Sequence, residues 1–248
     1  MEDLLKTVRE LKTKAKNRRD LERYASATSF LTKAIQELES ALANTTITDW
    51  KSQIASELAD CHGLLGGVYR RWGLSSVDQQ QRQERLQASF RAYDEGYGKY
   101  EAHEEYKIAN SYNRLNRLVS YLLFNPSSLD GTPVELPDGR KLPIRIELEM
   151  AEKSIRQQLI LERRGDIWVL ADLALVTLLL DRETPVEAYA NFIDASPPDY
   201  AYDSALSVLQ PLASLQLPVK SKLQVAVQLL EDKLQRIRFA HPLYANIQ

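Results

Sequence analysis

Apolar residues recur every three or four positions along most of this chain, which is the period of an amphipathic helix. In residues 2–18 the apolar positions include Leu4, Val8 and Leu11, and cations occupy the opposite side. The same pattern predicts further helices at about 20–43, 50–72, 78–97, 103–124, 144–164, 167–181, 185–195, 199–215 and 219–239. The sequence therefore predicts an all-α protein.

Several of these segments share a spacing of small, large and small residues along one ridge, which allows two helices of a hairpin to approach closely. The spacing occurs as Ala27-Leu31-Ala34, Ser89-Tyr93-Gly96 and Ala188-Phe192-Ala195. Self-similarity of this kind is typical of helical repeats. We expect a tetratricopeptide-like helical-hairpin solenoid of four to five helix pairs, forming a single helical-repeat domain over residues 1–248.

Three glycines lie in one predicted helix, at Gly63, Gly66 and Gly67. A glycine inside a helix costs roughly 1 kcal/mol relative to alanine. We expect the cost to be offset by the close approach of a neighbouring backbone, with Gly66 as a packing residue.

Two stretches depart from the helical period. The polar run 78–85 favours a solvated helix start over an enlarged turn, because glutamine, arginine and glutamate are good helix formers. Residues 126–143 contain four prolines and the turn sequence Pro137-Asp138-Gly139. They predict a loop or small hairpin insertion, expected to be dispensable for folding.

Two helices in the second half carry many apolar residues. Residues 167–181 are apolar nearly all round and are expected to form the most buried helix. In 144–164 the residues expected to be buried are Ile146, Met150, Ile155, Leu159 and Ile160.

Charge and cysteine content restrict the classes of function. The formal net charge of −2 gives no overall attraction to nucleic acid or membrane. A single cysteine, Cys61, excludes an internal disulfide framework and suits a reducing compartment. The start of the chain lacks the pattern of a signal peptide, and no apolar run reaches the ~20 residues that span a bilayer. We expect a cytoplasmic protein without membrane association.

Residues with catalytic or metal-binding chemistry do not form a convincing arrangement in the sequence. His103-Glu104-Glu105 lacks the second histidine of a zinc motif, since Lys107 occupies its position. Cys61 and His62 are adjacent on a helix, so their side chains diverge. We therefore expect no catalytic residue, no cofactor and no metal, and a protein that is not an enzyme.

Two groups of motifs carry a family resemblance. The first is Y-D-E-G-Y-G-K-Y-E followed by S-Y-N-R-L-N-R-L-V-S-Y-L-L, and the second is D-I-W-V-L-A-D-L-A-L-V-T-L-L-L followed by A-Y-A-N-F and P-P-D-Y. Over roughly residues 50–215 they resemble the TRAFs-binding domain, a tetratricopeptide-like region in the central regulatory part of apoptosis signal-regulating MAP kinase kinase kinases that also occurs in bacterial proteins. The sequence has no kinase motifs. The resemblance implies a helical-repeat architecture and a scaffold or regulatory role.

Cations recur on the predicted first helices of successive hairpins, which line the concave groove in tetratricopeptide proteins. Together with one asparagine they form the predicted partner-binding set: Lys12, Lys16, Arg19, Arg70, Arg71, Asn113, Arg114 and Arg117. This stripe predicts that the groove binds a protein or an acidic peptide. The sequence does not indicate an oligomeric state for this chain. Two alternatives stay open: the cations pair with nearby carboxylates, or the basic first helix and the arginine stripe bind nucleic acid. The basic face lacks interleaved aromatic residues, which disfavours base stacking.

Overall fold

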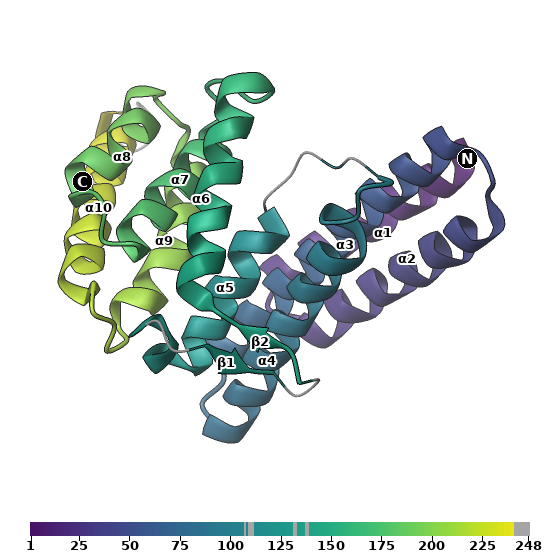
Figure 1. The fold of residues 1–248 in the computed structure, drawn as a ribbon, viewed down its shortest axis with the longest axis horizontal. Helices are drawn as coiled ribbons and strands as arrows, with labels where there is room; N and C mark the ends of the chain where they lie inside the picture. Colours follow the sequence, from purple (N-terminus) through teal and green to yellow (C-terminus); the bar gives the residue numbers. More distant parts are fainter. Residues whose placement is uncertain (107, 109–111, 131–132, 137–138, 241–248) are drawn as a thin grey trace. The chain divides into compact units, whose positions relative to one another are not determined.

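A computed structural model describes residues 1–106, 108, 112–130, 133–136 and 139–240 (Figure 1). The chain is all-α, as predicted, apart from one pair of two-residue strands in the described part. Its contacts divide it into two compact units, Met1–Phe124 and Asn125–Gln248, and each unit is described by itself. Within the described residues, no helix is both long enough and apolar enough to cross a membrane.

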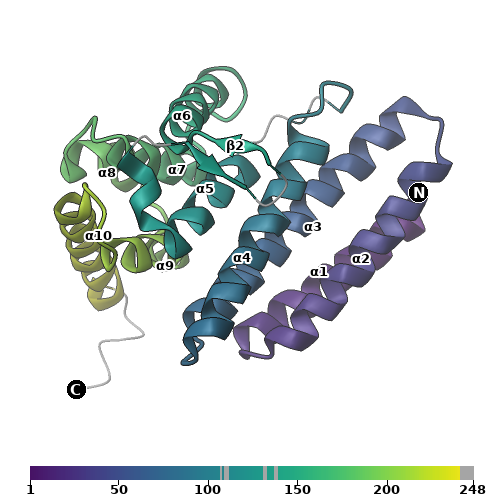
Figure 2. The ribbon, with the colours of Figure 1, turned by 60° about the horizontal axis from the view of Figure 1, so that its bottom comes forward.

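Unit 1 is built from antiparallel helices that pack side by side in chain order (Figures 1 and 2). Its elements are α1 (Glu2–Asp20), α2 (Tyr24–Asn44), α3 (Thr48–Leu74), α4 (Gln79–Gly96), the π-helical turn η1 (Tyr97–Glu101) and α5 (Tyr112–Phe124). The predicted helix 103–124 is too long, because residues 103–106 do not continue a helix and α5 begins at Tyr112. Lys107 and residues 109–111 lie outside the described residues.

The core of unit 1 joins the first hairpin to the helix that follows it. Val8 and Leu11 of α1, Leu38 of α2, and Ile54 and Leu58 of α3 belong to one buried cluster. A second cluster contains Ala15, Ala27, Leu31 and Val68 from the same three helices. Apolar residues of α3 thus pack against both helices of the preceding hairpin.

The glycines of α3 make room for side chains rather than for the neighbouring backbone that the sequence suggested. A Cβ atom at Gly66 would lie 2.6 Å from the Tyr93 ring of α4. A Cβ atom at Gly63 would lie 2.9 Å from Asn113 Oδ1 of α5. The packing role expected for Gly66 is confirmed, with an aromatic ring as the neighbour.

Local hydrogen bonds explain where α4 begins and how it ends. Asp78 caps the helix, because its Oδ1 accepts a hydrogen bond from the Gln81 backbone N–H at 2.7 Å. The polar run 78–85 is therefore a helix start, as predicted. At the other end the Ala102 N–H donates to the Tyr97 carbonyl at 2.8 Å, which widens the last turn into a π-helix.

Unit 2 begins with a short 3-10 helix and a two-stranded hairpin and continues with five α-helices in its described part. Its elements are η2 (Pro126–Asp130), β1 (Val134–Glu135), β2 (Lys141–Leu142), α6 (Ile144–Leu161), α7 (Ile167–Leu179), α8 (Pro185–Asp194), α9 (Asp199–Ala213) and α10 (Lys220–Ala240). The two strands pair antiparallel, with Val134 opposite Leu142. Leu136 and Leu142 are buried, which argues against a dispensable insertion. The predicted turn residues Pro137 and Asp138, and residues 241–248, lie outside the described residues.

The burial of α6 differs from the sequence prediction. Its buried side carries Ile144, Leu148, Ala151 and Ile155, whereas Ile146, Met150 and Ile160 are exposed. The prediction was wrong for these three residues because α6 has apolar residues on two opposite sides, and helical period alone does not tell which side packs inward. The helix α7 is buried from Ala174 to Leu179, but Trp168 in its first turn is exposed.

An ion-pair network ties α6 to the α7–α8 connection. The buried Glu152 carboxylate accepts a hydrogen bond of 2.9 Å from Arg156 Nε at Oε1, and another from Arg182 at Oε2. Arg182 also pairs with Glu149 at 3.3 Å. Two arginines thus compensate one carboxylate that has little access to water.

Candidate partner-binding surface

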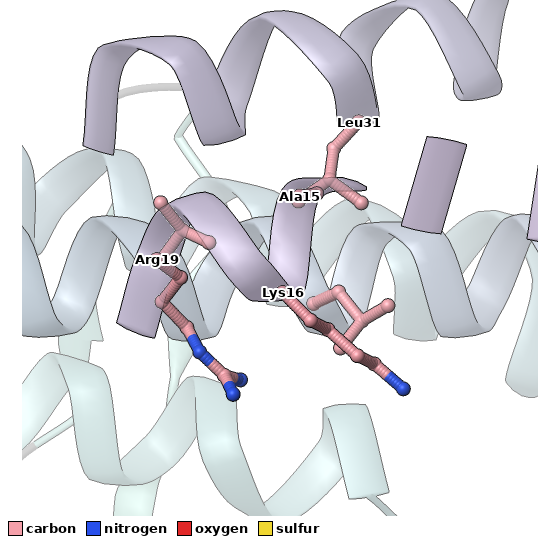
Figure 3. Close-up of a pocket in the computed structure, with 6 residues that line it drawn as sticks. Ala15, Lys16, Arg19 and Leu31 are labelled. Carbon is pink, nitrogen blue, oxygen red and sulfur yellow. The ribbon is translucent and has the colours of Figure 1, made fainter. Parts of the chain in front are cut away.

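A shallow hollow between the first three helices carries two of the predicted cations on its rim. Its apolar lining comes from Ala15 of α1, Leu31 of α2, and Leu64 and Val68 of α3, and its other lining residues are Lys16 and Arg19. Figure 3 shows the Lys16 and Arg19 side chains leaving α1 toward the same side of the hollow. The surface combines an apolar floor with two long cationic side chains.

Positive charge is in excess at this end of α1. In the described part of the chain, Lys16 has no carboxylate within ion-pair distance. The Asp20 carboxylate lies 2.8 Å from Arg19 Nε and 3.5 Å from Arg71 Nη1. Burial lowers the pKa of Arg71, and the neighbouring Arg19 charge lowers it further. The Asp20 carboxylate therefore pairs with two cations, Arg19 and Arg71, and Lys16 adds a third positive charge that is not neutralised by an ion pair among the described residues.

Lys12 lies on the same helix but is already neutralised. Its Nζ is 2.7 Å from Glu57 Oε2 and 2.5 Å from Asp60 Oδ2, both on α3. Burial acts to lower the pKa of Lys12, but the two carboxylates outweigh it and raise that pKa above its ordinary value. Lys12 links α1 to α3, in agreement with the alternative that some cations pair with carboxylates.

Arg70 is buried rather than open to a groove, contrary to the prediction. Its side chain is 8% exposed, and its Nη1 donates a hydrogen bond of 2.7 Å to Asn116 Oδ1 of α5. Its guanidinium lies 5.9 Å from the centre of the Tyr93 ring. Arg70 therefore helps to pack α3 against α4 and α5.

The three predicted residues of α5 are also buried, at 1% for Asn113, 9% for Arg114 and 4% for Arg117. Arg117 Nη1 donates to Asp94 Oδ1 at 2.9 Å, and its guanidinium lies 4.1 Å from the centre of the Tyr97 ring. Arg114 lies 5.4 Å from the same ring. The predicted open placement of both arginines is wrong, because α4 and η1 supply a carboxylate and an aromatic face that enclose them.

Asn113 connects α5 to two other segments. Its Nδ2 donates to the Ala59 carbonyl at 2.9 Å and to Glu101 Oε1 at 2.8 Å.

Burial raises the pKa of Glu101 to about 8. Hydrogen bonds from Asn113 and from the Arg114 backbone, and the charge of Arg117, act in the opposite direction. Burial lowers the pKa of His62, 4.0 Å from Glu95, to about 4. Sequence reasoning gave Glu101 no role of its own, although it ends the motif Y-D-E-G-Y-G-K-Y-E, and weighed His62 only as a neighbour of Cys61. The burial that shifts both pKa values comes from packing between helices, which helical spacing does not show.

Sequence reasoning also missed an aromatic cluster next to Arg71. The Trp72 ring stacks with Tyr24 at 6.1 Å and with Tyr69 at 6.4 Å between ring centres. The Arg85 guanidinium lies 4.1 Å from the centre of the Trp72 ring. Since three groups already pack on this indole, the cluster is a structural contact between α2, α3 and α4.

The described residues contain no group of three His, Cys, Asp or Glu side chains that could hold a metal ion. Burial raises the pKa of the Cys61 thiol to about 12, which leaves it protonated and unreactive at neutral pH. No protein-family model, curated protein or solved structure matches the chain.

Proposed function

We propose that this protein is a non-enzymatic interaction module that binds an acidic segment of a protein partner at the hollow of unit 1. The observation that carries the proposal is the pairing of Lys16 and Arg19 with an apolar floor between three helices. One apolar side chain of the partner packs over Leu64, the half-buried residue of the floor, and flanking carboxylates bind the two cations. Arginine suits this role because its planar guanidinium can hold a carboxylate with two hydrogen bonds.

The proposal includes a tetratricopeptide-like arrangement of unit 1 and a regulatory or scaffold role in the cytoplasm. Two observations support the arrangement: α1–α2 and α3–α4 form consecutive hairpins, and α3 shares core clusters with both α1 and α2. The buried free thiol of Cys61 is compatible with a reducing compartment. Of the eight predicted residues, the proposal keeps Lys16, Arg19 and Arg71 in the binding surface.

Nucleic acid fits the same surface less well. An apolar floor gives no partner to a phosphate, and the ring of Tyr24, which packs against the cluster that contains Ala15, Leu31 and Val68, is already stacked on Trp72. Protein segments that alternate acidic and apolar residues match both parts of the hollow. The two classes also differ in salt dependence, because phosphate binding releases condensed counterions and weakens steeply with salt.

The test is a selection of peptides from a random library on the intact protein, followed by affinity measurements on the selected peptides. We expect enrichment of aspartate and glutamate next to an apolar residue. A Lys16→Glu/Arg19→Glu double variant should bind the selected peptides at least about tenfold more weakly, because two attractive charges become repulsive. A Lys6→Glu/Lys14→Glu double variant is the matched control, with the same charge change on exposed positions of α1.

Two results would contradict the proposal. One is a selection without acidic enrichment, and the other is equal loss of affinity in both double variants. Single-stranded RNA serves as a polyanion comparison: tighter binding of RNA than of any selected peptide, with a steep salt dependence, would assign the surface to nucleic acid instead.

A further inference from the structure

The exposed side of α6 carries a second apolar stripe that no described helix of unit 2 covers. Its apolar members are Ile146, Met150, Ile160 and Leu161, which are 55%, 49%, 77% and 66% exposed. The buried stripe of Ile144, Leu148, Ala151 and Ile155 lies on the opposite side of the same helix. A helix that packs into its own unit through one side needs no apolar residues on the other.

The exposed stripe has the spacing of a coiled-coil seam. Ile146, Met150, Lys153, Gln157 and Ile160 follow one another at intervals of four, three, four and three residues, and all five are exposed. Alternating steps of four and three are the a and d positions of a heptad, which form the contact line between two supercoiled helices. Leu161 lies beside Ile160 at the edge of the seam.

We propose that α6 binds α6 of a second copy of this chain, antiparallel, about a two-fold axis that crosses the exposed seam between Lys153 and Gln157. In an antiparallel pair each a position faces a d position of the other helix. Placing Met150 opposite Ile160 of the second copy also places Lys153 opposite Gln157. The two-fold axis repeats both contacts, so Met150 meets Ile160 twice and Lys153 meets Gln157 twice. Ile146 lies beyond the last paired layer, because position 164, which would stand opposite it, follows the end of α6.

The charges of the seam select this orientation and this occupant. A parallel pair would place Lys153 against Lys153 of the other copy, whereas the antiparallel pair gives each ammonium group the carbonyl oxygen of a glutamine side chain. In the described part of the chain, Lys153 has no carboxylate within ion-pair distance. Ser154, at one side of the axis, is small enough to allow close approach.

Arg156 also lies near the axis, where it would meet Arg156 of the second copy. Its guanidinium is already held by Glu152 at 2.8 Å and Glu183 at 3.5 Å within its own chain. These carboxylates offset its charge and direct it along its own subunit. The residual repulsion and the short seam point to a reversible dimer, smaller than the ~800 Å² per partner of standard interfaces.

The first test is sedimentation equilibrium of the full chain from about 5 to about 500 μM, a range that detects micromolar association. We expect the wild type to shift from monomer to dimer across this range. Ile160→Glu should weaken the dimer at least about tenfold, because it places a carboxylate in each outer apolar layer. Val225→Glu, an exposed apolar position on α10, is the matched control and should leave the dimer unchanged. A monomer at every concentration, or a dimer that Ile160→Glu does not weaken, would overturn the proposal.

The second test addresses register and direction. Gln157→Lys should weaken the dimer by placing two lysines opposite each other twice, and Lys153→Gln/Gln157→Lys should restore it by exchanging the two partners. For direction, a mixture of Lys153→Cys and Gln157→Cys chains should form mixed disulfides on oxidation, while Cys61 stays buried. Disulfides formed mainly by Lys153→Cys chains alone would show a parallel pair and would refute the antiparallel arrangement. Circular dichroism of each variant checks that these exposed substitutions leave the fold intact.

Discussion

The contact between Gly66 and Tyr93 shows how one missing side chain sets the spacing of two helices. The Tyr93 ring is fully buried and lies where a Cβ atom of residue 66 would project. Moving the ring would disturb the core between α3 and α4, since interiors are close-packed. A methyl group at this point therefore acts on the whole helix pair.

We expect Gly66→Ala to lower the free energy of unfolding of unit 1 by about 1–3 kcal/mol, the usual range for overpacking, despite the better helix propensity of alanine. Gly98→Ala is the matched control, because a Cβ atom at Gly98 would meet nothing within 4 Å. Urea unfolding of both variants measures the difference. Equal stabilities would show that the Tyr93 ring yields easily.

Two buried ionisable side chains of unit 1 act on stability in opposite directions. The pKa of His62 falls from 6.5 to about 4, so its contribution is complete above pH 6.5 and is lost as the pH falls toward 4. The pKa of Glu101 rises from 4.5 to about 8, so its contribution is complete below pH 4.5 and is lost as the pH rises through 8. Between pH 6.5 and 8, Glu101 is the one of these two side chains whose ionisation changes the stability of unit 1.

We therefore expect the stability of unit 1 to fall from pH 6.5 to pH 8, and Glu101→Gln to flatten this decline. Glutamine keeps a carbonyl oxygen for the Asn113 and Arg114 N–H groups but does not ionise. Urea unfolding at pH 6.5, 7.2 and 8 tests this, followed by fluorescence in a Trp168→Phe background so that Trp50 and Trp72 report on unit 1. A decline that persists in Glu101→Gln would assign the pH dependence to another group.

At the residue scale, the sequence predicted which arginines of α5 share a helix face, but not which side chains surround them. Arg114 and Arg117 are three positions apart and do share a helix face, as expected. Their burial depends on Asp94 and Tyr97, which come from the preceding segment and fold onto that face. Such pairing is long-range, so helical spacing within α5 could not reveal it.

At the scale of elements, the order of the helices was predictable because each has a clear period and an identifiable end. Asp78 is an example: the sequence pattern of a helix start was sufficient, and the cap is present. The orientation of α6 was not predictable from helical period alone, because both sides of the helix carry apolar residues. Only the buried side carries Glu152, and its carboxylate pairs with Arg182 from the α7–α8 connection, a long-range contact that helical spacing within α6 does not show.

We expect Glu152→Ala to destabilise unit 2 by about 1–3 kcal/mol, because it leaves two arginines without their shared carboxylate. The value is reduced from that of a fully buried pair, since both arginines are nearly half exposed. Glu149→Ala, which removes an exposed partner of Arg182, should change stability by less than about 1 kcal/mol. Thermal unfolding of the two variants provides the comparison, and equal losses would contradict a special role for Glu152.

At the scale of the whole molecule, the sequence predicts one continuous repeat domain, whereas the contacts divide the chain after Phe124. Each unit has its own buried residues, and the repeat pattern does not mark the boundary. Helical spacing describes neighbouring helices, so it carries no information about whether hairpins on either side of residue 125 unfold together.

Unfolding can distinguish these possibilities. If the units are independently stable, Gly66→Leu should shift a transition reported by Trp50 and Trp72, and Glu152→Ala should shift a transition reported by Trp168. Fluorescence of single-tryptophan variants during urea unfolding measures each transition separately. A single transition that moves equally with either substitution would establish one cooperative domain, as the sequence predicts.

Because Cys61 is buried, its thiol can report how often unit 1 opens. Its side chain is fully buried in the cluster that joins α1, α2 and α3, so a thiol reagent can modify it only after these helices separate. The rate of labelling in native buffer therefore measures how often this region opens, without denaturant and without a mutation. A ligand that binds at Lys16 and Arg19 and holds α1 against α3 would slow that rate, so one thiol could report both spontaneous opening and occupancy of the hollow.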